Sequence, residues 1–273
     1  MKKNTIRIGV GTGFAGDRIE PAEILLEKAN LDYLVLECLA ERTIALAQKR
    51  KKANSSLGYD VLLEKRMQSL LPKLKNKATR IITNMGAANP QAGAEKILEI
   101  ANQLGISIKV AVVTGDDVLS KISLDETVWE TGKSLSDYGE ILSANAYIGA
   151  NALLSALQSD AQIIITGRVA DPSLFLAPMI HEFKWPLNEL DYLAQGTVVG
   201  HLLECAGQLT GGYFADPGKK DVTDLANLGF PYADVSNDGT AIFSKVENTG
   251  GQITLQTMKE QLLYEVLNPT AYT

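Results

Sequence analysis

Four side chains in the segment GHLLECAGQL are of types that perform acid–base chemistry. His201, Glu204, Cys205 and Gln208 are spaced i, i+3, i+4 and i+7, so a helix would place them on one face. Histidine titrates near neutral pH, and burial raises the pKa of a glutamate towards the same range. The pattern is consistent with His201 and Glu204 as a proton-transferring pair. The alternative is a structural pair beside Cys205, a small core residue unless a neighbour lowers its pKa.

Arg168 stands where an apolar run ends and a helical pattern begins. In ITGRVADPS it precedes Asp171-Pro172, a capping residue and a proline of the kind that begin helices. Free N–H groups at a helix start bind anions, and arginine binds carboxylates and phosphates in a bidentate way. We therefore expect Arg168 to bind a negatively charged part of a ligand. A surface charge in a tight turn is the alternative.

Glycines and polar residues follow four predicted strands, in the segments GTGFAGDR, NMGAANP, TGDD and TGRVADP. Ligands of parallel α/β sheets bind at the carboxyl ends of strands, where glycine lets them approach the backbone. Tyr147 in SANAYIGAN is a further candidate for this cleft, and His181 is expected to be structural. The substrate-binding residues predicted from these segments and the polar helix are Gly13, Asp17, Arg18, Asn84, Gly86, Asn145, Thr166, Gly167, Asp171 and Gln208.

The first of these loops resembles a dinucleotide-binding fingerprint. Gly11, Gly13 and Gly16 match G-x-G-x-x-G after a strand, and Glu37 ends the next predicted strand. However, the helix start that a proline marks lies several residues later, and Asp17 would oppose a pyrophosphate. NAD or a flavin is therefore the less favoured cofactor.

Asp116 and Asp117 follow the fourth predicted strand and could hold a divalent cation through carboxylate oxygens. The alternative is that one of them caps a following helix in DDVLSKI. The chain has two histidines and two cysteines, without Cys-x-x-Cys or His-Glu-x-x-His spacing, so a zinc site has little support. Apart from this candidate divalent cation, the sequence does not identify a cofactor.

The composition restricts the partners. The chain has 273 residues, 45% of them hydrophobic and 21% charged, with a net charge of −6. This net negative charge argues against nucleic acid and anionic membranes as binding partners. The sequence has neither a signal-peptide core nor an apolar run of the roughly 18 residues that span a membrane. Together with the isolated cysteines Cys38 and Cys205, this predicts a cytoplasmic protein with free thiols.

These residues must be positioned by an α/β fold. Apolar, β-branched runs alternate with helical patterns, which predicts a doubly wound, mainly parallel sheet with helices on both faces over residues 1–185. A smaller C-terminal α+β elaboration over 186–273 comprises a glycine-rich helix, two short strands around Gly250-Gly251 and a last helix, packed on the first domain. The predicted strands are 6–10, 33–37, 80–83, 109–113 and 162–166, and the predicted helices are 21–29, 60–74, 90–104 and 137–157.

The segments GFAGDR, TNMGAANP, SANAYIGA, ITGRVADPSLFLAPMIHEF and AQGTVVGHLLECAGQLTGGYFADPG resemble the acyclic terpene utilisation (AtuA) family along nearly the whole chain. The resemblance implies a role in the breakdown of acyclic terpenes and branched acids through acyl-CoA intermediates. It also implies a small companion domain or subunit. Because family members continue beyond residue 273, it implies a truncated form or fragment. It supplies no catalytic residues.

The leading hypothesis is a homo-oligomeric lyase or hydro-lyase acting on a small carboxylate or acyl-CoA. Arg168 would bind the anionic group, and His201 and Glu204 would exchange protons. Asp116 or Asp117 would orient the substrate or hold the cation. The alternatives are an NAD(P)-dependent oxidoreductase that uses the Gly11–Gly16 loop, and a non-catalytic binding or scaffold subunit.

Overall fold

The computed structural model describes residues 3–266, which form a seven-stranded sheet in the order β4-β5-β3-β2-β1-β6-β7. The first five strands are parallel, and β6 and β7 are antiparallel to their neighbours. All five predicted strands are present. The strands are β1 (Thr5–Thr12), β2 (Tyr33–Leu36), β3 (Arg80–Thr83), β4 (Val110–Val113), β5 (Ile163–Thr166), β6 (Pro231–Ser236) and β7 (Ala241–Lys245).

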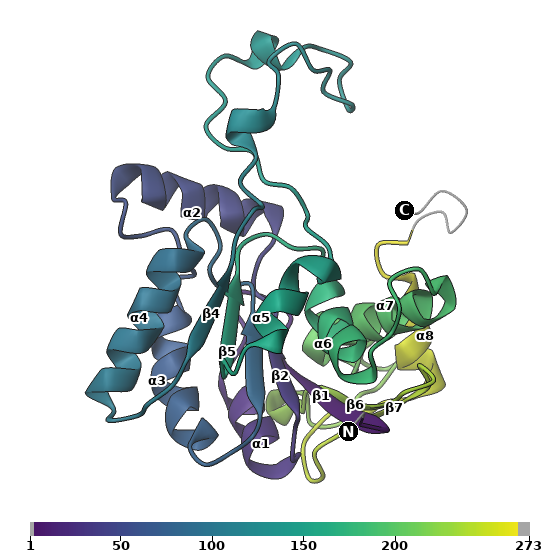
Figure 1. The fold of residues 1–273 in the computed structure, drawn as a ribbon. Coiled ribbons are helices and arrows are strands. Elements are labelled where there is room, and N and C mark those ends of the chain that lie inside the picture. The colour runs from purple at the N-terminus through teal and green to yellow at the C-terminus, as the bar shows by residue number, and fades with distance from the viewer. Residues whose placement is uncertain (1–2, 267–273) are drawn as a thin grey trace.

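The helices form two groups, seen on either side of the sheet in Figure 1. α1, α3 and α4 pack on one another, and so do α5, α6 and α7. Every residue of β2 and β5 is buried, as expected for parallel strands that are covered on both faces. The helices are α1 (Glu20–Lys28), α2 (Glu41–Ala53), α3 (Leu63–Leu74), α4 (Pro90–Gln103), α5 (Leu154–Gln158), α6 (Ser173–Phe183), α7 (Leu190–Glu204) and α8 (Leu255–Leu263). None of these helices is long and apolar enough to cross a membrane.

The predicted helix over residues 137–157 is wrong. The chain forms 3-10 turns at Leu135–Tyr138 and Ala150–Leu153, and α5 begins only at Leu154. Gly139 has a φ of 80°, which a right-handed helix does not allow, and the residues around it offer no continuous apolar face to pack. The helix predicted in DDVLSKI is likewise one 3-10 turn, Leu119–Lys121.

Of the two strands predicted around Gly250-Gly251 in TAIFSKVENTGGQITL, the one before the glycines is present as β7, and the one after them is wrong. The antiparallel hairpin is β6–β7, and β6 pairs with β1, so residues 231–245 extend the same sheet as the first five strands. In PYADVS the apolar side chains alternate, and Ala233 and Val235 are buried against the sheet. Gly251 instead has a φ of 82° in the loop that leads to α8, the helix predicted there.

Candidate functional site

Three carboxyl groups from distant parts of the sequence lie near one another. Glu37 follows β2, Asp171 follows β5 and Glu204 ends α7. Burial raises the pKa of Glu37 to about 8, and the charge of Asp171 adds to the rise. Burial raises the pKa of Asp171 to about 7, where Arg168 opposes the rise and the charge of Glu204 adds to it. The charge of Asp171 thus acts on Glu37 and the charge of Glu204 acts on Asp171, and we call these three groups the carboxyl cluster.

Glu37 is the buried member of the carboxyl cluster, with 8% of the residue exposed. Its Oε1 accepts hydrogen bonds from Asn84 Nδ2 and from the Leu39 main-chain N–H, both at 2.8 Å. Asn84, which follows β3, also accepts from the Cys38 N–H at 2.8 Å. Asn84 thus joins the loops after β2 and β3 and positions Glu37. From the sequence, Glu37 was expected only as the acidic residue of a dinucleotide-binding fingerprint.

Arg168 is 2% exposed, so the alternative of a surface charge is wrong. Its Nε and Nη2 donate to the Val169 carbonyl at 2.9 and 2.7 Å, its Nη1 donates to the Leu39 carbonyl, and Nη2 also binds Asp171. The Tyr147 ring lies 4.3 Å from the guanidinium carbon. The guanidinium is thus fixed between the loops after β2 and β5.

Asp171 does not cap α6 as predicted. Pro172 occupies the cap position without a side-chain cap bond, and the Asp171 carboxylate pairs with Arg168 instead. A charged partner three residues earlier outcompetes the neutral N–H groups of the helix start. The Asp171 side chain is 36% exposed, so it is the member of the carboxyl cluster that faces solvent.

Two glycines bring the end of α7 to this edge of the sheet. A Cβ on Gly200 would lie 2.8 Å from the Pro172 carbonyl oxygen, and one on Gly13 would lie 2.4 Å from the Cys205 carbonyl carbon. Because no side chain fits at either contact, α7 packs directly on the β5–α6 loop and on the loop after β1. The GHLLEC segment therefore faces the Arg168 loop.

His201 and Glu204 form a buried pair, with His201 Nδ1 3.1 Å from Glu204 Oε1. This hydrogen bond raises the pKa of His201, and burial raises the pKa of Glu204. Four buried polar atoms in this region have no hydrogen-bond partner among the described residues. They are His201 Nε2, Glu204 Oε2, Gln208 Oε1 and Gln261 Oε1. Four buried polar atoms without partners in one region indicate a site that takes up a ligand or water.

The helix that was predicted to carry His201, Glu204, Cys205 and Gln208 on one face ends earlier than expected. α7 stops at Glu204, Ala206 has a φ of 46°, and Gln208 lies in a 3-10 turn. α8 contributes to the region instead, through a hydrogen bond from Gln261 Nε2 to the His201 carbonyl at 3.3 Å. Burial raises the pKa of Cys205 to about 12, which argues against a thiolate nucleophile.

The loop after β1 does not have the geometry of a dinucleotide cradle. Asp17 Oδ2 accepts the Gly13 N–H at 2.8 Å, where a pyrophosphate would bind, and α1 begins four residues after Gly16. Arg18 is exposed and donates to the Ala226 and Leu228 carbonyls, away from the carboxyl cluster. This loop shapes the packing of α7.

Asp116 and Asp117 do not act together. Asp116 is buried and accepts from the Arg168 main-chain N–H and from Asn145 Nδ2, both at 2.9 Å. Asp117 is exposed and accepts from the Leu119 N–H at 3.2 Å. Within residues 3–266 no group of three or more His, Cys, Asp or Glu is arranged to hold a metal ion. Asp116 therefore positions the Arg168 loop.

The remaining predicted residues of the β3 and β5 loops are packed against each other. A Cβ on Gly86 would lie 2.4 Å from the Thr166 carbonyl oxygen, and one on Gly167 would lie 2.5 Å from Asp116 Oδ2. The Thr166 hydroxyl donates to the Gly167 carbonyl at 2.9 Å. These residues set the shape of the site's floor.

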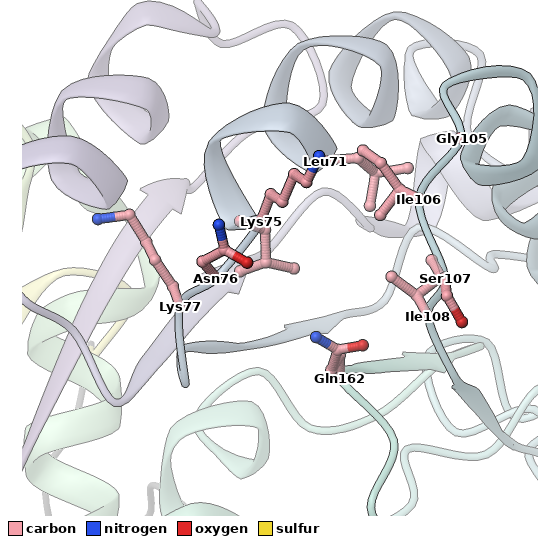
Figure 2. Close-up of a pocket in the computed structure, with 10 residues that line it drawn as sticks. Leu71, Lys75, Asn76, Lys77, Gly105, Ile106, Ser107, Ile108 and Gln162 are labelled. Carbon is pink, nitrogen blue, oxygen red and sulfur yellow. The ribbon is translucent and has the colours of Figure 1, made fainter.

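A separate hollow of about 350 Å³ lies at the opposite ends of the strands, among residues that precede β4 and β5 (Figure 2). Gln162 and Ile108 border it, and Lys77 extends away from the other side chains. No carboxylate, histidine or cysteine lines this hollow, so it lacks the acid–base groups of the carboxyl cluster.

Comparison with known proteins gives one match. The family model described as "Acyclic terpene utilisation family protein AtuA" matches residues 6–273. No curated protein and no solved structure matches the chain.

Proposed function

Because the chain belongs to the acyclic terpene utilisation family AtuA, we propose that it is an enzyme of acyclic terpene or branched-acid breakdown. Its substrate is a small carboxylate or the corresponding CoA thioester, and its reaction is of the lyase or hydro-lyase type. Such a reaction needs a base for a C–H proton and an acid for the leaving group. One observation carries the proposal: the carboxyl cluster combines raised pKa values with a solvent-facing member, Asp171.

Asp171 is the group that contacts the substrate, because its side chain is the most exposed of the carboxyl cluster. With a pKa of about 7 it exchanges a proton readily at neutral pH. Glu37, with a pKa of about 8, is protonated at neutral pH and supplies the acid. Glu204, held by His201, is the base on the α7 side. Carboxyl groups whose environments separate their pKa values are suited to opposite roles.

Arg168 positions Asp171 and supplies positive charge for an anionic substrate. The guanidinium Nη1 carries two N–H groups and has one acceptor within residues 3–266, the Leu39 carbonyl. The second N–H is directed to the substrate carboxylate or thioester oxygen in this proposal.

The test is incubation of the purified protein in D₂O with branched acyl-CoAs and hydroxy acids, with and without Mg²⁺. Mass spectrometry then follows the gain or loss of water and the uptake of deuterium. We expect deuterium at the carbon next to the carbonyl of a turned-over substrate. If no branched substrate gains or loses water and none takes up deuterium, the proposal is overturned and the non-catalytic binding subunit is favoured.

His201→Asn is expected to lower the rate about tenfold, the usual size of an effect on an orienting partner. The His201 hydrogen bond lowers the pKa of Glu204 against the larger effect of burial, so its loss raises that pKa. A base with a higher pKa ionises later, and the acidic limb of the pH–rate profile therefore moves to higher pH. The profile is measured with the substrate found above.

His181→Asn is the matched control, since His181 is the other histidine of the chain and lies in α6 outside the carboxyl cluster. Its pH–rate profile should equal that of the wild type. Equal profiles for the His201 variant and the wild type would contradict the role of His201.

A further inference from the structure

Residues 118–140, which we call the arm, project from the body of the protein between β4 and α5. Figure 1 shows the arm extending beyond the sheet and past α2. Its regular structure is two 3-10 turns, Leu119–Lys121 and Leu135–Tyr138, and a bridge between Thr127 and Ser134. Almost all of its side chains are exposed or half-exposed. The arm thus lacks a core of its own.

The arm exposes large apolar side chains. Trp129 is 94% exposed, and Leu124 and Tyr138 are each about half exposed. Tryptophan and tyrosine are enriched at the centres of protein–protein interfaces, where burial of their rings supplies most of the binding energy. Such a group of exposed apolar residues on a projecting segment is typical of a contact with another protein chain.

The arm and α2 are complementary in charge. The arm carries five acidic and two basic side chains, whereas α2 carries five basic and one acidic. Arg42, Leu46 and Lys49 are exposed and spaced i, i+4 and i+7, so they share one face of α2. This face offers both an apolar side chain and cations to an acidic, apolar segment.

In its own chain the arm leaves this face of α2 exposed. Lys52 pairs with Glu140 at 3.1 Å, and Gln48 Nε2 donates to Asn145 Oδ1 at 3.0 Å. Tyr147 is bonded to Glu41. These contacts fix the return of the arm along its own α2 and direct the outer part beyond that helix (Figure 1).

We propose that the arm of one copy of this chain docks on the exposed face of α2 in a second copy, and that the two copies exchange arms in a two-fold dimer. A two-fold axis makes one arm–α2 contact generate its reciprocal, so both arms are buried at once. α2 begins two residues after Leu39, whose carbonyl binds Arg168, so the contact adjoins the candidate site.

The test is sedimentation velocity of two charge-reversed variants, alone and mixed. One variant carries Glu126→Lys and Glu130→Lys in the arm, and the other carries Arg42→Glu and Lys49→Glu in α2. We expect the wild type to be a dimer. Each variant alone should dimerise with an affinity lower by roughly tenfold or more, because like charges then face each other. An equimolar mixture should dimerise again, since both of its contacts pair opposite charges.

Trp129→Ser should weaken dimerisation at least roughly 30-fold, as the loss of a central interface tryptophan does. Ile242→Ser is the control, because Ile242 is also strongly exposed but lies on β7. A monomeric wild type, a dimer that survives arm reversal, or a mixture that stays monomeric would overturn the proposal. A monomer that binds a different protein through the arm would also overturn it. None of these readouts depends on enzymatic activity.

Discussion

Asp171→Asn is expected to slow turnover of the substrate by about 10²–10⁴-fold, the usual contribution of a general acid or base. Asparagine has nearly the same shape and keeps an oxygen that accepts from Arg168, but it does not titrate. The wild-type carboxyl group, with a pKa of about 7, changes its protonation state within the working range. The rate is measured by mass spectrometry, and thermal unfolding monitored by circular dichroism checks the fold.

Asp216→Asn is the control for this variant. Asp216 also pairs with a cation three residues away, Lys219 at 3.5 Å, but this pair is exposed. Its replacement should leave the rate unchanged. A folded Asp171→Asn protein that turns over substrate at the wild-type rate would remove Asp171 from the proton path.

Arg168→Met is expected to lower the free energy of unfolding by about 2–5 kcal/mol, because each of two buried main-chain carbonyls left without a donor costs about 1–3 kcal/mol. Methionine fills much of the space but donates no hydrogen bond, so the Leu39 and Val169 carbonyls lose their donors. Asp171 also loses the cation that lowers its pKa. Urea unfolding at neutral pH measures the loss.

Arg18→Met is the matched control, because Arg18 also donates to two main-chain carbonyls but is exposed to solvent. Water can replace its hydrogen bonds, so we expect a loss of about 1 kcal/mol or less. Similar losses of unfolding free energy for the two variants would show that the burial of Arg168 does not increase its contribution to stability.

Sequence patterns sufficed for the parallel part of the sheet. Runs such as residues 33–36 are apolar at every position, which is a local signal of a strand that is covered on both faces. The strand β6 was missed because it depends on pairing with β1, more than 200 residues away. Residues 137–153 were taken for part of a helix because short polar and small residues carry no signal against one.

The candidate site was predicted in part. Arg168, Glu204 and His201 were named from residue type and spacing, but their proximity depends on glycine contacts between α7 and two loops. Asp171 was expected both as a helix cap and as a substrate-binding residue, and the competing arginine at i−3 was a signal against the cap that was available in the sequence. An acidic residue directly after a fully apolar strand could likewise have indicated that Glu37 is buried.

The most direct measurement is a pH titration of the side-chain carboxyl ¹³C shifts, with Glu37→Gln and Asp171→Asn to assign the signals. We expect carboxyl transitions at about pH 8 for Glu37 and about pH 7 for Asp171. Asp171→Asn should lower the pKa of Glu37, because the charge of Asp171 adds to its rise. Transitions of both groups near their ordinary values of 4.5 and 3.8 would contradict the coupled carboxyl cluster on which the proposed chemistry depends.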